Sequence, residues 1–436
     1  MSDRPALLGF DVNRIRDYVF AGLRVRDVVG ASVLLEEFGR QARRIMADHG
    51  ATVVYTGGGN GLARCHADQA TPLRVALETE LSRRTAGGAS CAVSWVPDTG
   101  RFPEDRQALM HALARAKRED LLDLTPEAAL LVDGAARCEG CGLEAATTTD
   151  PKAEGEPIGP QCDTRRRTAD GLHRSFNLET ELFEQAGESS LACVYLDADR
   201  AGDAINACGT PEELGRFAET MTKATRRAHD GALAALNLTD RTISPVLGGD
   251  DLIVFCDAQH ALDLVAALWR HLDAAKAPAI TGVRFSAGVS VAPSRTPLRI
   301  VYDEAYRALR AAKHAPGDTE HFGLVSLGGR ALDDPDQPLL GGPLPREMLV
   351  DLRTLLAALD EVPPSQRAGI GADLTEAAHG SIALAELNLA YRAARSIEVG
   401  AVVEQAHRIA RALDRQVHTV LQGALALGGW NRGRRT

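Results

Sequence analysis

Four residues between two apolar runs carry the clearest chemistry in this sequence, the Gly-Gly-Asp-Asp motif at residues 248–251. The run ISPVL precedes the motif and LIVF follows it, which predicts two strands joined by a tight hairpin turn with carboxylates at its tip. Upstream, another apolar run, CVYL, ends in Asp-Ala-Asp at residues 197–199. Carboxylates delivered from two neighbouring strands form the oxygen ligand set that Mg²⁺ prefers. The spacing therefore predicts a magnesium site.

The expected reaction is a phosphoryl transfer, because two ions about 4 Å apart would clamp its attacking and leaving oxygens. We assign Asp197, Asp250 and Asp251 as catalytic metal ligands. Asp199 shares a strand face with Asp197 and either completes the site or caps the following helix. Gly248 and Gly249 provide positive φ and let phosphate approach the backbone. This pattern is typical of palm-type nucleotidyl transferases and nucleotide cyclases.

An internal repeat indicates the elements that position these residues. ALLGFD, ending at Asp11, resembles ACVYLD, ending at Asp197, and ALARAK, ending at Lys117, resembles ALRAAK, ending at Lys313. Gly-Gly-Gly-Asn at 57–60 stands where the second copy has its acidic motif. Because Asn60 carries no negative charge to hold magnesium, we expect the first copy to be catalytically silent. A duplicated module is the economical explanation.

Each module is expected to run strand, helix, strand–turn–strand, helix, strand, helix, close to the ferredoxin-like βαββαβ arrangement. Helical periodicity covers 210–238 and 258–276, and a helix is expected around 297–314. The predicted fold class is α+β, with two ferredoxin-like palm or cyclase domains, a zinc-ribbon-like insert and a C-terminal helical bundle. The predicted boundaries are 1–125 for the degenerate palm, 126–180 for the insert, 181–330 for the catalytic palm and 331–436 for the helical domain.

Three cysteines in a loop-rich stretch suggest a structural zinc site: Cys138, Cys141 and Cys162. A second CxxC is broken, because Arg165 occupies the fourth place. His173 or Asp163 could substitute, and we favour His173. Cys193 and Cys256 lie in or beside apolar runs and are expected to be buried free thiols.

The composition is that of a globular protein, with 45% hydrophobic and 25% charged residues and a net charge of −10. A broad nucleic-acid-binding face is not indicated, because neutralising phosphates needs clustered Lys and Arg. The basic runs 165–167 and 432–435 are expected to be solvated. No run reaches the roughly 18 apolar residues of a membrane span, and the N-terminus has no signal-peptide layout. A cytoplasmic protein without membrane contact is expected.

The stretch DVNRIRDYVFAGLRVRDVVGASVLLEEF at 11–38 resembles the opening of the large polymerase-like subunit of type III CRISPR effector complexes. The order of silent palm, cysteine insert, GGDD palm and helical C-terminal region fits the same family. The resemblance implies an enzyme that makes cyclic oligoadenylate, an antiviral second messenger, from ATP with magnesium. It also implies that Asp250 and Asp251 hold the metals together with Asp197. CRISPR-complex subunits, RNA and a homo-oligomer are the implied partners.

Two further lysines follow from this resemblance and from the repeat. Lys313 resembles the Lys that ends the corresponding helix in cyclase palms, which implies a triphosphate contact, against a solvated Lys at a helix end. Lys117 is a second candidate phosphate contact through the repeat alone. No HD-nuclease motif precedes the first palm, and His229-Asp230 is interpreted as a surface pair. We therefore expect a compact or stand-alone relative.

Two alternatives stay open at this point. A GGDEF-like cyclase using GTP shares the fold, although Asp251 and Leu252 stand where such proteins have Glu and Phe. A non-catalytic scaffold subunit of an RNA-guided complex would tolerate Asp250→Ala and co-purify with RNA.

Overall fold

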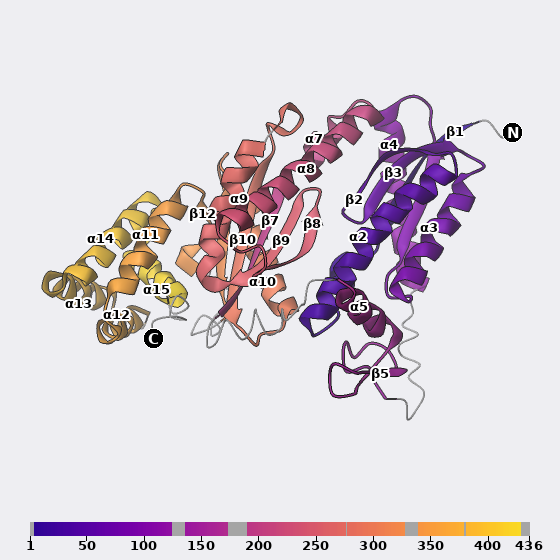
Figure 1. The fold of residues 1–436 in the computed structure, drawn as a ribbon. Helices are drawn as coiled ribbons and strands as arrows, with labels where there is room; N and C mark the ends of the chain where they lie inside the picture. Colours follow the sequence, from indigo (N-terminus) through magenta and orange to yellow (C-terminus); the bar gives the residue numbers. More distant parts are fainter. Residues whose placement is uncertain are drawn as a thin grey trace.

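The computed structural model describes residues 4–123, 136–172, 190–275, 277–327, 339–378 and 381–428. Two α+β modules follow one another, a small cysteine-containing insert lies beside the first, and helices form the C-terminal end (Figure 1). The predicted fold class is thereby confirmed. Within the described ranges, no helix combines the length and the apolar character that a membrane span requires.

The first palm is a four-stranded antiparallel sheet with the order β2-β3-β1-β4. This is the ferredoxin-like order expected from the repeat. Its elements are β1 (Pro5–Val12), α1 (Ile15–Val19), α2 (Val25–Asp48), β2 (Thr52–Gly57), β3 (Asn60–His66), α3 (Ala70–Thr85), β4 (Cys91–Pro97) and α4 (Phe102–Asp123).

The second palm repeats this core order as β8-β9-β7-β10 and extends it beyond β10 with β11 and β12. Strand β11 is parallel to β10, and β12 lies beyond the predicted boundary at residue 330. The elements are β7 (Ser190–Asp199), α7 (Ala201–Asn206), α8 (Pro211–Ala235), β8 (Ile243–Gly248), β9 (Asp251–Asp257), α9 (Ala261–Ala275), β10 (Arg284–Pro293), α10 (Leu298–Lys313), β11 (His321–Ser326) and β12 (Leu344–Pro345). The helices expected within 210–238, 258–276 and 297–314 are all present.

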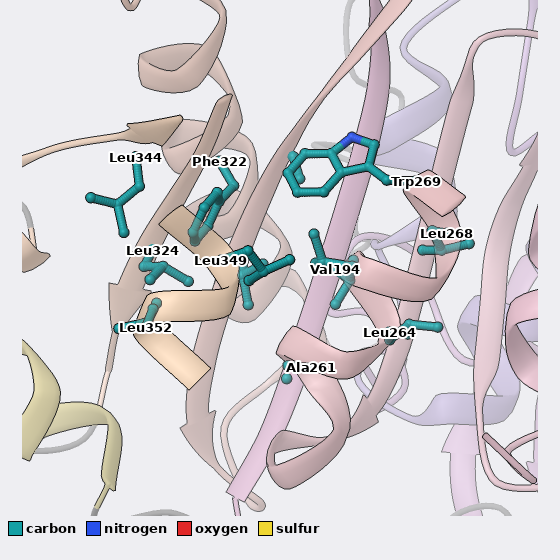
Figure 2. Packing of buried hydrophobic residues seen from close by; sticks show 14 of the residues in the cluster. Val194, Ala261, Leu264, Leu268, Trp269, Phe322, Leu324, Leu344, Leu349 and Leu352 are labelled. Atoms are coloured by element: carbon teal, nitrogen blue, oxygen red, sulfur yellow. The ribbon is translucent and has the colours of Figure 1, made fainter. Parts of the chain in front are cut away.

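The central strand β7 is buried on both faces, and its side chains alternate between two cores. Val194 and Leu196 face the core beneath α8 and α9, which also receives the C-terminal helices. Figure 2 shows Val194 in this layer with Trp269 of α9, while Leu349 and Leu352 lie over β11. Cys193 and Tyr195 face a second core, which takes in α10 and residues of the first palm. The two palms therefore share a continuous hydrophobic interior.

Close backbone contact fixes helix α10 against the palm sheet. A Cβ atom on Gly288 of β10 would lie 2.0 Å from the carbonyl oxygen of Ala305. Only glycine permits this approach, which sets the position of Lys313 at the end of the helix.

The insert contains β5 (Thr148–Asp150), β6 (Glu156–Ile158) and α5 (Pro160–Asp170), and α5 packs on α2 of the first palm. The prediction of a solvated 165–167 run is wrong for two of its three arginines. Arg166 is 2% exposed and pairs with Asp27 at 2.7 Å and Asp150 at 2.7 Å. Arg165 is 1% exposed, with its guanidinium carbon 4.3 Å from the centre of the Tyr18 ring. These charges join the insert to the first palm. The 432–435 run lies outside the described residues.

The C-terminal region is helical, as expected. Its helices are α11 (Met348–Glu361), α12 (Pro364–Ala378), α13 (Ile382–Arg395), α14 (Ile397–Ala412) and α15 (Val417–Gly428). Helix α11 packs against both α14 and α15, and their apolar faces join the core beneath the second palm.

Candidate active site

The antiparallel ladder brings the two acidic segments together. Asp197 of β7 is paired with Asp251 of β9, and Gly248 of β8 is paired with Asp251 from the other side. Asp250 is the neighbouring turn residue. Paired residues point to the same face of a sheet, so Asp197 and Asp251 are side by side, as the sequence predicted. In the first palm the corresponding rung pairs Asp11 with Asn60.

A hydrogen bond from helix α8 supports the turn that presents Asp250. Gly249 has φ +62°, a conformation that favours glycine, whereas Gly248 has no positive φ, so that part of the prediction is wrong. Its carbonyl oxygen accepts a hydrogen bond of 2.8 Å from the hydroxyl of Thr225, which is 1% exposed on α8. Helix α8 therefore fixes the hairpin tip. Sequence reasoning gave Thr225 no role.

Asp199 belongs to the acidic face rather than to a helix cap. One oxygen of its carboxylate accepts a 2.9 Å hydrogen bond from Ser286 of β10. The following helix α7 begins after Arg200 and has no side-chain cap, so the capping alternative is wrong. The other oxygen, Oδ1, is buried and has no hydrogen-bond partner among the described residues.

Lys313 ends helix α10 at the acidic rung. Its ammonium is 2.5 Å from Asp197 Oδ2 and donates to the carbonyl oxygen of Ala198 at 2.9 Å. The first palm repeats this contact, with Lys117 at 2.5 Å from Asp11. The repeat thus preserves an Asp–Lys pair in both copies, although only the second adds the acidic turn.

Burial and mutual repulsion make the acidic face reluctant to ionise. Burial, with the neighbouring charges of Asp197 and Asp250, raises the pKa of Asp251 to about 7. Burial also raises the pKa of Asp197, against the opposing effect of Lys313, and that of Asp199, against the hydrogen bond from Ser286. Excess negative charge in a partly buried place favours binding a cation.

The donor set fits Mg²⁺, since it consists of carboxylate oxygens on one face and includes the unpartnered Asp199 Oδ1. Among the described residues, the only group whose ligand atoms all lie within 4.8 Å of one another is the cysteine cluster. The acidic residues therefore do not form a single compact cluster of this kind, and one oxygen of Asp197 is paired with Lys313.

One contact in this site was missed from the sequence. The hydroxyl of Tyr195 donates a 2.9 Å hydrogen bond to Asp251 Oδ1. Burial raises the pKa of Tyr195, so it remains a donor. Strand alternation could have indicated Tyr195, because residues 195, 197 and 199 share one face of β7.

The insert holds a second candidate metal centre. Cys138, Cys141, Cys162 and Glu144 have their ligand atoms within 4.8 Å of one another. Three thiols and a carboxylate fit a tetrahedral zinc site. The Glu144 carboxylate also accepts backbone N–H groups of Gln161 and Cys162 at 3.2 Å, at the start of α5. A hydrogen bond from Cys162 lowers the pKa of the Cys141 thiol to about 6.

The described residues offer a fourth candidate ligand that the sequence did not indicate. Glu144, three residues after Cys141, lies in the cluster. Asp163 pairs with Arg167 at 2.8 Å and is not in the group, while His173 lies outside the described residues.

His229 is not a surface residue, which corrects that interpretation. It is 9% exposed, and its Nε2 lies 2.7 Å from Ser244 Oγ of β8. Only Asp230, 2.8 Å from Nδ1, is exposed. The pair joins α8 to the hairpin strand. The thiols of Cys193 and Cys256 are free and buried, as expected.

Comparison with known proteins decides the relationship of the second palm. Residues 190–319 match the family described as Cas10/Cmr2, second palm domain. The chain resembles a Cas10-like subunit of type III CRISPR systems. That resemblance, predicted from the motifs, is confirmed. No curated protein gives a significant match.

Solved structures of the Csm1-Csm4 cassette share the fold. The cassette in complex with cA4 matches with a TM-score of 0.65 and 14% identity, over 99% of this chain and 70% of that chain. The complex with pppApA gives 0.63 and 15%, over 99% and 70%. The apo cassette gives 0.51 and 17%, over 71% of this chain and only 53% of that chain. The chain thus spans about half to seven tenths of these relatives.

Proposed function

We propose that this chain is a nucleotidyl transferase that joins ATP into cyclic oligoadenylate at the second palm. The proposal rests on one observation, the Asp197–Asp251 rung beside Asp250 within a palm similar to that of Cas10/Cmr2 proteins. The resemblance to cassettes solved with cA4 and pppApA supports adenine nucleotides as substrates. A ribose hydroxyl of one nucleotide attacks the α-phosphate of another, pyrophosphate leaves, and ring closure follows.

In this proposal the aspartates bind the metal ions, and Lys313 and the two glycines contact the phosphates. Asp197, Asp250 and Asp251 would hold two Mg²⁺ ions, with Asp199 as a further ligand. Bound Mg²⁺ would neutralise charge on the attacking and leaving oxygens. Lys313, whose ammonium lies 2.5 Å from Asp197, would contact the triphosphate as a mobile point charge. Gly248 and Gly249 allow the phosphates to approach the turn.

The first palm provides the acceptor side in this proposal. Its rung has Asn60 where the second palm has Asp251, so it holds no metal and is catalytically silent. Lys117 contacts the acceptor phosphate. Loss of product in Lys117→Ala with unchanged acceptor affinity would remove this role.

The cysteine cluster holds a structural zinc ion in this proposal, with Cys138, Cys141 and Cys162 as ligands. Glu144 is the fourth ligand within the described residues. The ion stabilises the insert, which has a small apolar cluster of its own made of Cys138, Ile158 and Cys162.

A CRISPR-type antiviral complex is the proposed setting, since the structural relatives were solved together with Csm4. The partners would be a subunit of that kind and RNA.

One experiment tests the activity directly. Purified protein is incubated with Mg²⁺ and each of the four nucleoside triphosphates, with and without RNA, and the products are identified by mass spectrometry. We expect cyclic adenylate products from ATP, lost in Asp250→Ala and Asp251→Ala. Asp240→Asn, an exposed residue before β8, is the matched control and should retain activity.

Each other outcome has a definite meaning. Products from GTP alone would identify the GGDEF-like cyclase alternative. Absence of product from every nucleotide, together with co-purifying RNA, would overturn the enzyme proposal in favour of the scaffold alternative.

A further inference from the structure

Tyr195 lies where a side chain can control a metal-binding carboxylate. It is 2% exposed in the middle of β7, directly opposite Ile253 of β9. Asp251 is its diagonal neighbour on the same face, within reach of a long aromatic side chain. Their hydrogen bond of 2.9 Å links the phenol to the carboxylate next to the turn.

We propose that Tyr195 is a positioning residue that holds Asp251 in its ion-binding orientation, and that the first palm braces it through a stack of aromatic rings. This inference rests on the proposed function for its catalytic consequence, and on geometry alone for its effect on ion binding.

The stack has little freedom to move. The ring of Tyr195 is stacked on Tyr302 and Tyr306 of α10, with centroid distances of 5.8 and 6.1 Å. Helix α10 is in turn fixed by the close approach of Gly288 to Ala305. Because packed neighbours restrict the rotamers of Tyr195, its hydroxyl is presented at one place. A second partner of this kind orients a ligand before the ion arrives.

The first palm supplies the outer end of this stack. Phe20, which follows α1, is stacked on Tyr302 with a centroid distance of 4.4 Å and an interplanar angle of 16°. The guanidinium carbon of Arg16 in α1 is 4.0 Å from the centroid of Tyr306. The copy that lacks the acidic turn therefore contributes to the site of the other copy through packing. A displacement of α1 would therefore shift the ring of Tyr195 through the stacked rings between them.

The test uses Tyr195→Phe, which keeps the ring and removes only the hydroxyl. Tyr302→Phe is the matched control, since the Tyr302 hydroxyl is buried without a hydrogen-bond partner among the described residues. Binding of Mn²⁺, measured by electron paramagnetic resonance without nucleotide, is the main readout. We expect Tyr195→Phe to weaken Mn²⁺ binding about tenfold and Tyr302→Phe to leave it unchanged.

In turnover assays, Tyr195→Phe should raise the Mg²⁺ concentration needed for half-maximal rate, while the KM for ATP at saturating Mg²⁺ stays constant. A merely structural role would change both or neither. Equal Mn²⁺ affinity for Tyr195→Phe and wild type would overturn the positioning role.

The brace from the first palm is tested with Arg16→Gln, a substitution at an exposed position. We expect about a two- to fivefold loss of Mn²⁺ affinity, which should become smaller in the Tyr195→Phe background because both changes act through one stack. Fully additive effects would refute the brace. A wild-type protein that binds Mn²⁺ but makes no product refutes the proposed function alone, and the Mn²⁺ comparisons still decide the role of Tyr195.

Discussion

Asp251→Asn should stabilise the metal-free protein at pH 8, although it removes a catalytic residue. The folded protein holds the pKa of Asp251 at about 7, against an ordinary value of 3.8. The unfolded chain therefore gives up this proton more readily than the folded chain. The stability associated with the protonated carboxyl is complete below about pH 4 and is lost as the pH rises through 7. Asparagine cannot ionise and avoids that loss.

The structure sets an upper limit on the effect. The two pKa values differ by about 3 pH units, and each unit corresponds to about 1.4 kcal/mol, which gives a ceiling of about 4 kcal/mol. The measured effect should fall below this ceiling, because the raised pKa of Asp251 comes partly from the neighbouring charge of Asp197, whose own pKa is also raised, so the two ionisations are not independent. We expect a gain of about 1–2 kcal/mol at pH 8 in EDTA and about a quarter of that gain at pH 4.5, where the carboxyl is ionised mainly in the unfolded chain.

Thermal unfolding of wild type, Asp251→Asn and the control Asp240→Asn, at both pH values with EDTA, measures this difference. Adding Mg²⁺ at pH 8 should raise the unfolding temperature of wild type more than that of Asp251→Asn, since ligands stabilise the state that binds them. An Asp251→Asn protein that is less stable than wild type in EDTA at pH 8 would refute the reasoning about repulsion.

Three other outcomes are expected. Zinc analysis should find about one ion per chain in wild type and none in Cys138→Ser. Glu144→Gln should lose its zinc to a chelator more readily than wild type. If Glu144→Gln retains zinc as well as wild type does, Glu144 is not a ligand. Gly30→Ala should disrupt packing of α5 on α2, because its Cβ would lie 1.9 Å from the carbonyl oxygen of Arg165. Gly39→Ala on the same helix should be neutral or stabilising, because its Cβ would meet no atom within 4 Å. Hydrogen exchange should show reduced protection of α5 in Gly30→Ala and unchanged protection in Gly39→Ala. Thr225→Val should lower the free energy of unfolding by about 1 kcal/mol and reduce product formation, because it removes the hydrogen bond to the turn. Thr225→Ser keeps the hydroxyl and should retain both stability and activity. Equal behaviour of the two variants would show that the Thr225 hydroxyl does not support the turn.

Much of the fold could be predicted because both copies keep the same local pattern. The apolar runs before Asp11 and Asp197 became equivalent strands, and the two glycine-rich turns occupy equivalent rungs of their ladders. The basic run 165–167 was misjudged because its partners, Asp27 among them, are distant in sequence. Buried Arg–Asp pairs leave no local periodic signal.

The relative placement of the acidic residues could be predicted from the sequence alone. Strand alternation places Asp197 and Asp199 on one face, and a two-residue turn must present Asp250 beside Asp251. Tertiary structure alone decided which side chains would surround them. The hydroxyls of Tyr195 and Thr225 and the ammonium of Lys313 arrive from separate elements. The ring of Phe20, from the first palm, packs behind them on Tyr302. Turns and alternation act over a few residues and can be read locally, whereas these contacts depend on how two palms and a helix pack in space.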